Sequence, residues 1–256
     1  MWLCSSTCVN CEGEYILQLR EKIMGINFHR WMMTWGMVFG STFWLILWNI
    51  NNDFAQLLVG EDHVIESAQF VFLFLGAIYF TLLARMETGF LRYFFLLAML
   101  SAFFLAMEEI SWGQRIFDIT TPKGLEEINV QGEINFHNLE FFQGYRHWYL
   151  GGVVSLGLLA TYVSASFFQL IKPDNILRYA FFLTLLTSIV MEFANFQFGL
   201  IEQGQARQIR FFAGRFSEIG ELAFSMAVFS YAWCKYYWPR ENIVVKCLIP
   251  SSPKLY

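Results

Sequence analysis

The sequence is poor in charged residues. Only 15% of its 256 residues are Asp, Glu, Lys or Arg, whereas in soluble globular proteins the share is about a quarter. Hydrophobic residues make up 56% of the chain, aromatic residues account for 19%, and the formal net charge is −4. No cluster of Lys and Arg is present that could neutralise phosphates, which excludes a nucleic-acid partner. The composition predicts an integral membrane protein whose main partner is the lipid bilayer.

Linkers, repeats and a secretory signal are also missing. The five prolines are scattered, and no Pro-, Gly- or Ser-rich stretch divides the chain, which favours one compact unit. No secretory signal peptide precedes the first apolar run, and both Met1 and Met24 are candidate start residues. We expect a cytoplasmic leader at 1–30, a single transmembrane helical domain at 31–238 and a cytoplasmic tail at 239–256.

Cysteine is present at five positions, three of them in the leader. Cys4, Cys8 and Cys11 have the C-x3-C-x2-C spacing with which radical-SAM enzymes hold an iron–sulfur cluster through thiolates. Such an enzyme needs a barrel domain, for which the predicted membrane spans leave no room. We therefore interpret these cysteines as reduced thiols of a cytoplasmic segment.

Six apolar runs are predicted to cross the hydrocarbon layer, about 30 Å thick, as helices. They cover about residues 31–50, 64–83, 93–107, 148–171, 176–196 and 218–238. The predicted fold is an all-α bundle of about six transmembrane helices, with a long polar outer connector between the third and the fourth. Tryptophans fall at the predicted ends of the spans, as in an interfacial aromatic belt, at Trp31, Trp48, Trp112, Trp148 and Trp238.

The placement of Lys and Arg predicts the orientation of these spans. If both termini are cytoplasmic, 11 of the 17 Lys and Arg residues lie on the cytoplasmic side. The main exception is residues 202–216, expected as a polar outer loop, which carries Arg207, Arg210 and Arg215. We predict a multi-pass protein with both termini in the cytoplasm.

This topology brings acidic residues of separate spans to the same outer end. They are Glu66, Glu108, Glu109, Glu192, Glu218 and Glu221. A carboxylate in hydrocarbon costs roughly 2.5–3.5 kcal/mol on insertion scales, so these groups must be paired, protonated, bound to metal or hydrated. In the connector, Glu133, His137 and Glu140 would share one face if 133–143 were helical.

Three interpretations of this polar layer remain open. The first is a divalent metal that activates water, with Glu109, Glu133, His137 and Glu140 as ligands. The second is a metal-free mechanism in which one glutamate of a pair acts as general base. The third is structural, because arginines on the same side, such as Arg115 and Arg146, could pair with the glutamates and hold the loops to the bundle.

The motifs EEISWGQR (108–115) and NVQGEINFHN (129–138), with EDHVIES (61–67) before them, resemble a family of uncharacterised bacterial polytopic membrane proteins. The resemblance covers about residues 30–230. It implies a location in the bacterial inner membrane, and it implies no established activity.

A second similarity is to the CAAX-protease-like intramembrane family, whose pattern joins a Glu-Glu pair and an arginine to Phe-x3-His and His-x3-Asn/Asp. Glu108, Glu109 and Arg115 resemble the first element, and His137 resembles the histidine of the second. Here five residues rather than three separate the pair from the arginine, position 133 is Glu rather than Phe, and a second His-x3-Asn/Asp is missing. The similarity implies a hydrolase.

The function that these observations predict is a membrane-embedded hydrolase or transferase acting on a lipid-linked or membrane-peptide substrate. Glu108 or Glu109 would be the base, His137 the acid or a ligand, and Arg115 would hold an anionic group. The substrate is expected to contact Glu66, Gln114, Asn138, Glu192 and Arg210. The alternative is a non-catalytic membrane subunit or a small-solute or ion carrier in which the glutamates form structural ion pairs, with a membrane-protein partner or a homo-oligomer.

Overall fold

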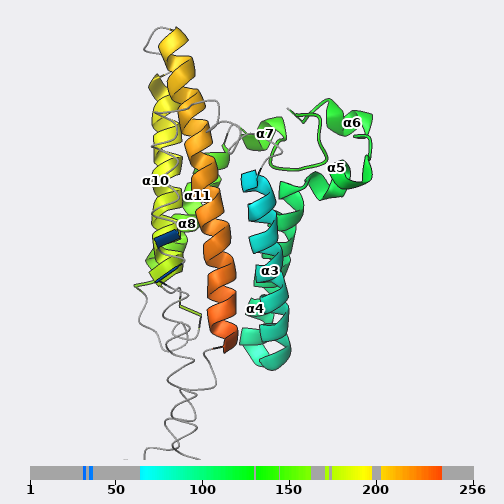
Figure 1. The fold of residues 1–256 in the computed structure, drawn as a ribbon, viewed down its shortest axis with the longest axis vertical. Helices are drawn as coiled ribbons and strands as arrows, with labels where there is room; N and C mark the ends of the chain where they lie inside the picture. The colour runs from blue at the N-terminus through cyan, green and yellow to red at the C-terminus, as the bar shows by residue number, and fades with distance from the viewer. Residues whose placement is uncertain are drawn as a thin grey trace, which may run out of the picture.

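The computed structural model describes residues 31–32, 35–36, 64–129, 131–143, 145–162, 171–172, 175–197 and 203–237. All regular elements of this part are helices, and its one β-feature is an isolated bridge between Asn129 and Leu139 (Figure 1). The predicted all-α class is therefore confirmed. The predicted tail, the whole predicted leader and most of the first predicted span lie outside the described residues.

Five long helices form the body of the molecule. They are α3 (Val64–Met86), α4 (Gly89–Glu109), α8 (Arg146–Ala160), α10 (Asn175–Gln197) and α11 (Gln203–Tyr237). Among the described residues, α3, α4 and α10 contain segments long and apolar enough to cross a membrane, and Trp148–Ala160 is a shorter apolar helix. At about 1.5 Å per residue, the 21 residues of α4 span about 31 Å, which matches the hydrocarbon layer.

Two predicted spans agree closely with the helices, and one predicted loop is wrong. α3 begins at the predicted residue 64, and α10 covers 175–197 where 176–196 was expected. Residues 202–216 were expected as a polar outer loop, yet α11 begins at Gln203 and continues through its arginines. The segment has no proline to stop a helix, and it buries Ala213 and Phe216.

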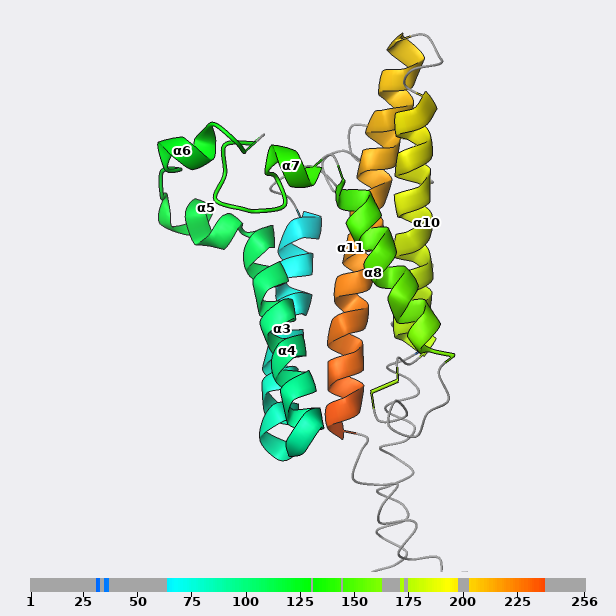
Figure 2. The same cartoon turned by 180° about the vertical axis from the view of Figure 1, so that it is seen from behind.

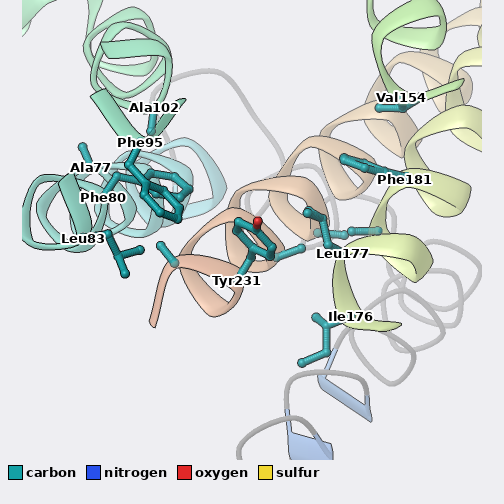
Figure 3. Packing of buried hydrophobic residues seen from close by; sticks show 14 of the residues in the cluster. Ala77, Phe80, Leu83, Phe95, Ala102, Val154, Ile176, Leu177, Phe181 and Tyr231 are labelled. Atoms are coloured by element: carbon teal, nitrogen blue, oxygen red, sulfur yellow. The ribbon is translucent and has the colours of Figure 1, made fainter. Parts of the chain in front are cut away.

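α11 lies in the middle of the bundle. The α3–α4 hairpin packs against one side of α11, α10 packs against the other, and α8 packs against α10 (Figures 1 and 2). Figure 3 shows the apolar core that joins them, in which Phe80 stacks on Phe95 and also contacts Tyr231, with ring centroids 6.2 Å apart in both pairs. The core also includes Leu177 and Phe181 of α10.

Small residues let these helices approach closely, as is common where helices pack in membranes. A Cβ atom added at Gly220 of α11 would overlap the side chain of Thr187 of α10, and one added at Gly157 of α8 would overlap Phe181. The carbonyl of Gly220 also accepts a hydrogen bond from the Thr184 hydroxyl at 3.1 Å. The α10–α11 pair is therefore held by close backbone contact and a polar bond.

A buried amide joins α3 to α11. Gln69 is fully buried, and its Nε2 donates to the backbone oxygen of Glu218 at 3.2 Å. A second polar bond, from the hydroxyl of Tyr231 to the carbonyl of Ile171 at 2.7 Å, ties α11 to the turn before α10. These two bonds fix the positions of α3 and α10 along the central helix.

The connector between α4 and α8 extends to one side of the bundle (Figures 1 and 2). The helices among its described residues are short turns, which are η1 (Ser111–Gly113), α5 (Gln114–Phe117), α6 (Lys123–Glu126) and α7 (Glu140–Gln143). The condition under which Glu133, His137 and Glu140 would share one helix face is not met, because in 133–143 only the single turn α7 is helical. The hydrogen bonds of the connector explain this.

Candidate functional site: the Glu108–His137 pair

A left-handed turn follows α4. Ser111, Trp112 and Gly113 all have positive φ values, of 46°, 56° and 80°. For residues with a Cβ this conformation costs roughly 1–2 kcal/mol each, so it persists only where surrounding contacts impose it. The turn places the side chains of Ser111 and Trp112 against acidic residues of the two sequence motifs.

The carboxylate of Glu108 is buried and accepts hydrogen bonds on both oxygens. Its Oε1 accepts from the indole Nε1 of Trp112 at 2.6 Å. Its Oε2 accepts from the backbone N–H groups of Phe136 at 2.7 Å and His137 at 3.0 Å. A buried charge is stable only with such partners, so Glu108 attaches the second motif to the end of α4.

The imidazole of His137 contacts the same carboxylate. Its Nδ1 lies 3.3 Å from Oε2 of Glu108. Because two backbone N–H groups already donate to this oxygen, Oε2 acts as an acceptor, and the contact requires the proton to be on Nδ1. The second ring nitrogen, Nε2, is then an acceptor, and it forms no hydrogen bond within the described part of the chain. The side chain of His137 is 35% exposed, against 5% for Glu108, so the imidazole is accessible while its partner is not.

Glu133 supports the left-handed turn. Its Oε2 accepts from the Ser111 hydroxyl at 2.8 Å and from Nδ2 of Asn135 at 2.7 Å. Asn135 Nδ2 also lies 3.2 Å from the Ser111 oxygen, and both Ser111 and Asn135 are buried. The glutamate that was predicted as a metal ligand therefore holds EEISWGQR against NVQGEINFHN.

Side-chain acceptors hold the beginning of the segment 133–143 in a non-helical conformation. Asn129 Oδ1 accepts from the backbone N–H of Glu133 at 3.2 Å, and Gln114 Oε1 accepts from that of Ile134 at 2.6 Å. The next two amides in the network, those of Phe136 and His137, bond to Glu108 as described above. Gly132, with φ of 68°, makes the turn before them. A helix would pair the amide of His137 with the carbonyl of Glu133 and the amide of Glu140 with that of Phe136. These two amides bond instead to Glu108 and to the carbonyl of Ile128.

The four predicted metal ligands are not brought together. Glu109 is the half-buried last residue of α4, Glu140 is exposed at the start of α7, and Glu133 and His137 face the partners given above. In the described ranges, no group of three or more His, Cys, Asp or Glu side chains could hold a metal ion. The geometry therefore gives no support to the metal interpretation of this layer.

Of the predicted substrate contacts, two take part in the connector's own hydrogen bonds. Gln114 donates from Nε2 to Thr121 Oγ1 at 2.7 Å in addition to accepting from Ile134. The buried amide of Asn138 donates to Gln131 Oε1. Both residues stabilise the connector, which leaves them little capacity to bind a substrate.

The remaining predicted site residues lie elsewhere. Glu66 is half-buried in the first turn of α3, and Glu192 is half-buried in α10. The side chains of Arg115 and Arg210 lie outside the described residues, although their backbones are in α5 and α11. The structure thus brings together Glu108 and His137 out of the predicted catalytic set.

Two residues that build this unit, Trp112 and Asn129, were not among the predicted site residues. Trp112 was assigned to an aromatic belt, yet it donates to Glu108, and the four-residue spacing of the two positions was the available signal. Asn129 bonds both the carbonyl and the side chain of Asn135, at 2.9 and 3.0 Å. An asparagine shortly before a glycine is typical of a turn, and this signal was also present.

No protein-family model, curated protein or solved structure matches the chain. The resemblances of EEISWGQR and NVQGEINFHN to known families therefore stay predictions. The structure adds that these two motifs form one hydrogen-bonded unit, at whose surface one imidazole nitrogen is available.

Proposed function

We propose that the protein is a membrane-embedded hydrolase or transferase in which His137 is the general base. The observation that carries the proposal is the contact of 3.3 Å between His137 Nδ1 and Glu108 Oε2. A carboxylate in this position selects the tautomer with a free Nε2, orients the ring, and stabilises the imidazolium formed during reaction. The geometry therefore favours Glu108 as a positioning residue, and the base is His137.

The reaction would begin with a proton transfer to Nε2. The proton comes from water or from a substrate hydroxyl, while its oxygen attacks an acyl or phosphoryl centre. The imidazolium then returns the proton to the leaving group, so that the imidazole is neutral again at the end of the cycle. Glu108 remains ionised throughout, because the N–H donors of Trp112, Phe136 and His137 stabilise its negative charge.

The position of the pair indicates the substrate class. Glu108 lies at the end of a helix of about membrane length, and His137 is held beside it. A bond at the level of the lipid head groups would be within reach of Nε2. This supports a lipid-linked substrate, or a membrane peptide with its reactive bond near the bilayer surface.

A second candidate is a non-catalytic subunit. The observation in its favour is that the connector uses most of its polar side chains in its own hydrogen bonds, including those of Gln114, Glu133 and Asn138. Such a rigid unit would suit contact with another membrane protein. In this case Nε2 of His137 would have no chemical role.

The test uses His137→Asn, because the Nδ2 atom of asparagine lies as many bonds from Cα as Nδ1 of histidine does. This variant keeps a donor for Glu108 and loses only the base. Wild type, His137→Asn and the matched surface control Glu127→Gln are added to native bacterial membranes, and lipids and peptides are followed by mass spectrometry. Glu127 is exposed in the same connector. We expect turnover by wild type and control, and a rate at least about 100-fold lower for His137→Asn.

Equal rates for His137→Asn and wild type would contradict the proposal. So would the absence of any converted lipid or peptide with wild-type protein, in which case the subunit interpretation holds. Hydrogen exchange at the amides of Phe136 and His137 shows in each case whether the connector is still attached to Glu108.

A further inference from the structure

The connector exposes many large apolar side chains. Three of these side chains lie in α5 or just after it: Ile116 is 65% exposed, Phe117 is 72% exposed and Ile119 is 46% exposed. We call these three residues the α5 edge. Further exposed aromatic residues follow later in the connector, at Phe136, Phe141, Phe142 and Tyr145. An exposed apolar surface of this kind marks a contact with a protein, a ligand or a membrane.

The polarity of the connector changes along the long axis of the molecule. In both views of the ribbon, α5 lies between the end of α4 and α6 in the direction of this axis (Figures 1 and 2). α6 and the residue after it expose charges, at Lys123, Glu126 and Glu127. The apolar α5 edge is therefore nearer to the level of the candidate spans, and the charged turn is farther from it.

Both ends of the connector are attached directly to long helices, with the polar pairs Glu108-Glu109 and Arg146-His147 at the two junctions. Ile110 follows directly on the 21-residue α4, and the apolar helix Trp148–Ala160 begins three residues after Tyr145. The connector also folds back toward the spans, because the ring of Phe136 lies 6.0 Å from that of Phe104. Phe104 precedes the end of α4 by five residues, or about 7 Å. Part of the connector therefore packs beside the last turns of a candidate span.

We propose that the α5 edge is a lipid-contact surface that lies in the interfacial layer of the bilayer. The occupant is phospholipid, because α5 follows closely on α4, which itself exposes apolar side chains such as Leu97 and Leu100. The charged α6 turn lies farther from the spans (Figures 1 and 2), and within the α5 edge Asp118 is exposed as well. Aromatic and branched apolar side chains with charges on the opposite side are typical of segments that lie in this layer. The inference does not depend on a catalytic role of His137.

The experiment measures depth with a nitroxide spin label on the full chain in vesicles of phosphatidylethanolamine and phosphatidylglycerol. The labelled variants are Ile116→Cys, the second apolar position Phe136→Cys, and the charged control Glu127→Cys. Cys4, Cys8, Cys11 and Cys247 are replaced by serine, whereas Cys234 is buried and remains. Power saturation compares the collision rates of each label with oxygen, which concentrates in lipid, and with a water-soluble nickel chelate.

We expect the ratio of oxygen to nickel collisions to be at least about threefold higher at positions 116 and 136 than at position 127. Equal ratios at all three positions would overturn the proposal in favour of a water-exposed surface. Exclusion of both reagents at position 116, with an immobilised spectrum, would overturn it in favour of a protein contact. The readout is independent of turnover, and His137→Asn protein is expected to give the same ratios, so this proposal and the proposed function can fail separately.

Discussion

Single side chains of the connector determine its structure, and Glu108 has the central place. Its two oxygens meet donors from different parts of the chain, which are the indole of Trp112 on one side and the amides of Phe136 and His137 on the other. Because all of these groups donate, only a group that accepts on both sides can satisfy them. The site therefore requires a carboxylate.

Glu108→Gln is expected to detach residues 136–137 from α4. In either orientation of the carboxamide, its NH₂ group faces a donor, and a buried donor left unsatisfied costs about 1–3 kcal/mol. Hydrogen exchange at the amides of Phe136 and His137 should become roughly 10- to 100-fold faster, since about 1.4 kcal/mol corresponds to a factor of ten. Glu127→Gln is the control. Unchanged exchange in Glu108→Gln would show that this carboxylate does not hold the connector.

Among the helices, α10 and α11 can approach closely because Gly220 of α11 has no side chain. Gly220 leaves room for Thr187, and its carbonyl accepts from Thr184. In the same way, Gly157 of α8 leaves room for the ring of Phe181 of α10. These pairs explain how α10 can pack between α8 and the central α11.

Gly220→Ala is expected to destabilise the protein by about 1–3 kcal/mol, because the added methyl group overlaps Thr187 and forces the two helices apart. The matched control is Gly152→Ala on α8, where an added Cβ atom would meet nothing within 4 Å; alanine there is neutral or stabilises the helix by up to about 1 kcal/mol. Thermal unfolding in detergent, followed by circular dichroism, measures both. A Gly220→Ala protein as stable as wild type would contradict the assigned packing.

For the whole molecule, the helices group the segments that were predicted to be outer. The connector, the end of α10 and the beginning of α11 lie toward one end of the bundle, and the turn between α3 and α4 lies toward the other (Figures 1 and 2). The predicted outer segments are thus on one side. That this side faces away from the cytoplasm, in a bacterial inner membrane, stays a prediction.

Single cysteines in a chain without other cysteines test this orientation. Lys123 of α6 and Thr88 between α3 and α4 are both exposed, at opposite ends of the α3–α4 hairpin. A maleimide that cannot cross membranes should label Lys123→Cys in intact spheroplasts and Thr88→Cys only after lysis. Labelling of Thr88→Cys before lysis, with Lys123→Cys protected, would reverse the predicted orientation.

The sequence by itself determined the membrane character, the helical class and the positions of α3 and α10. The length and apolar content of a continuous run of residues are enough to predict a membrane-spanning helix. The sequence also located the polar region and named Glu108 and His137. Local patterns failed at 202–216, where charge suggested a loop although the helix continues. They also left open whether 133–143 is helical, and only α7 is.

Only the tertiary structure decided which polar groups meet. The bonds from Glu108 to the amides of Phe136 and His137 join residues 28 and 29 positions apart, and spacing along the chain carries no information about such pairs. The amide of His137, which a helix over 133–143 would pair with Glu133, bonds to Glu108 instead. Residues 133–139 are not helical, so Glu133, His137 and Glu140 do not share a helix face. The Glu108–His137 pair exists because the left-handed turn at Ser111–Gly113 brings the two motifs together.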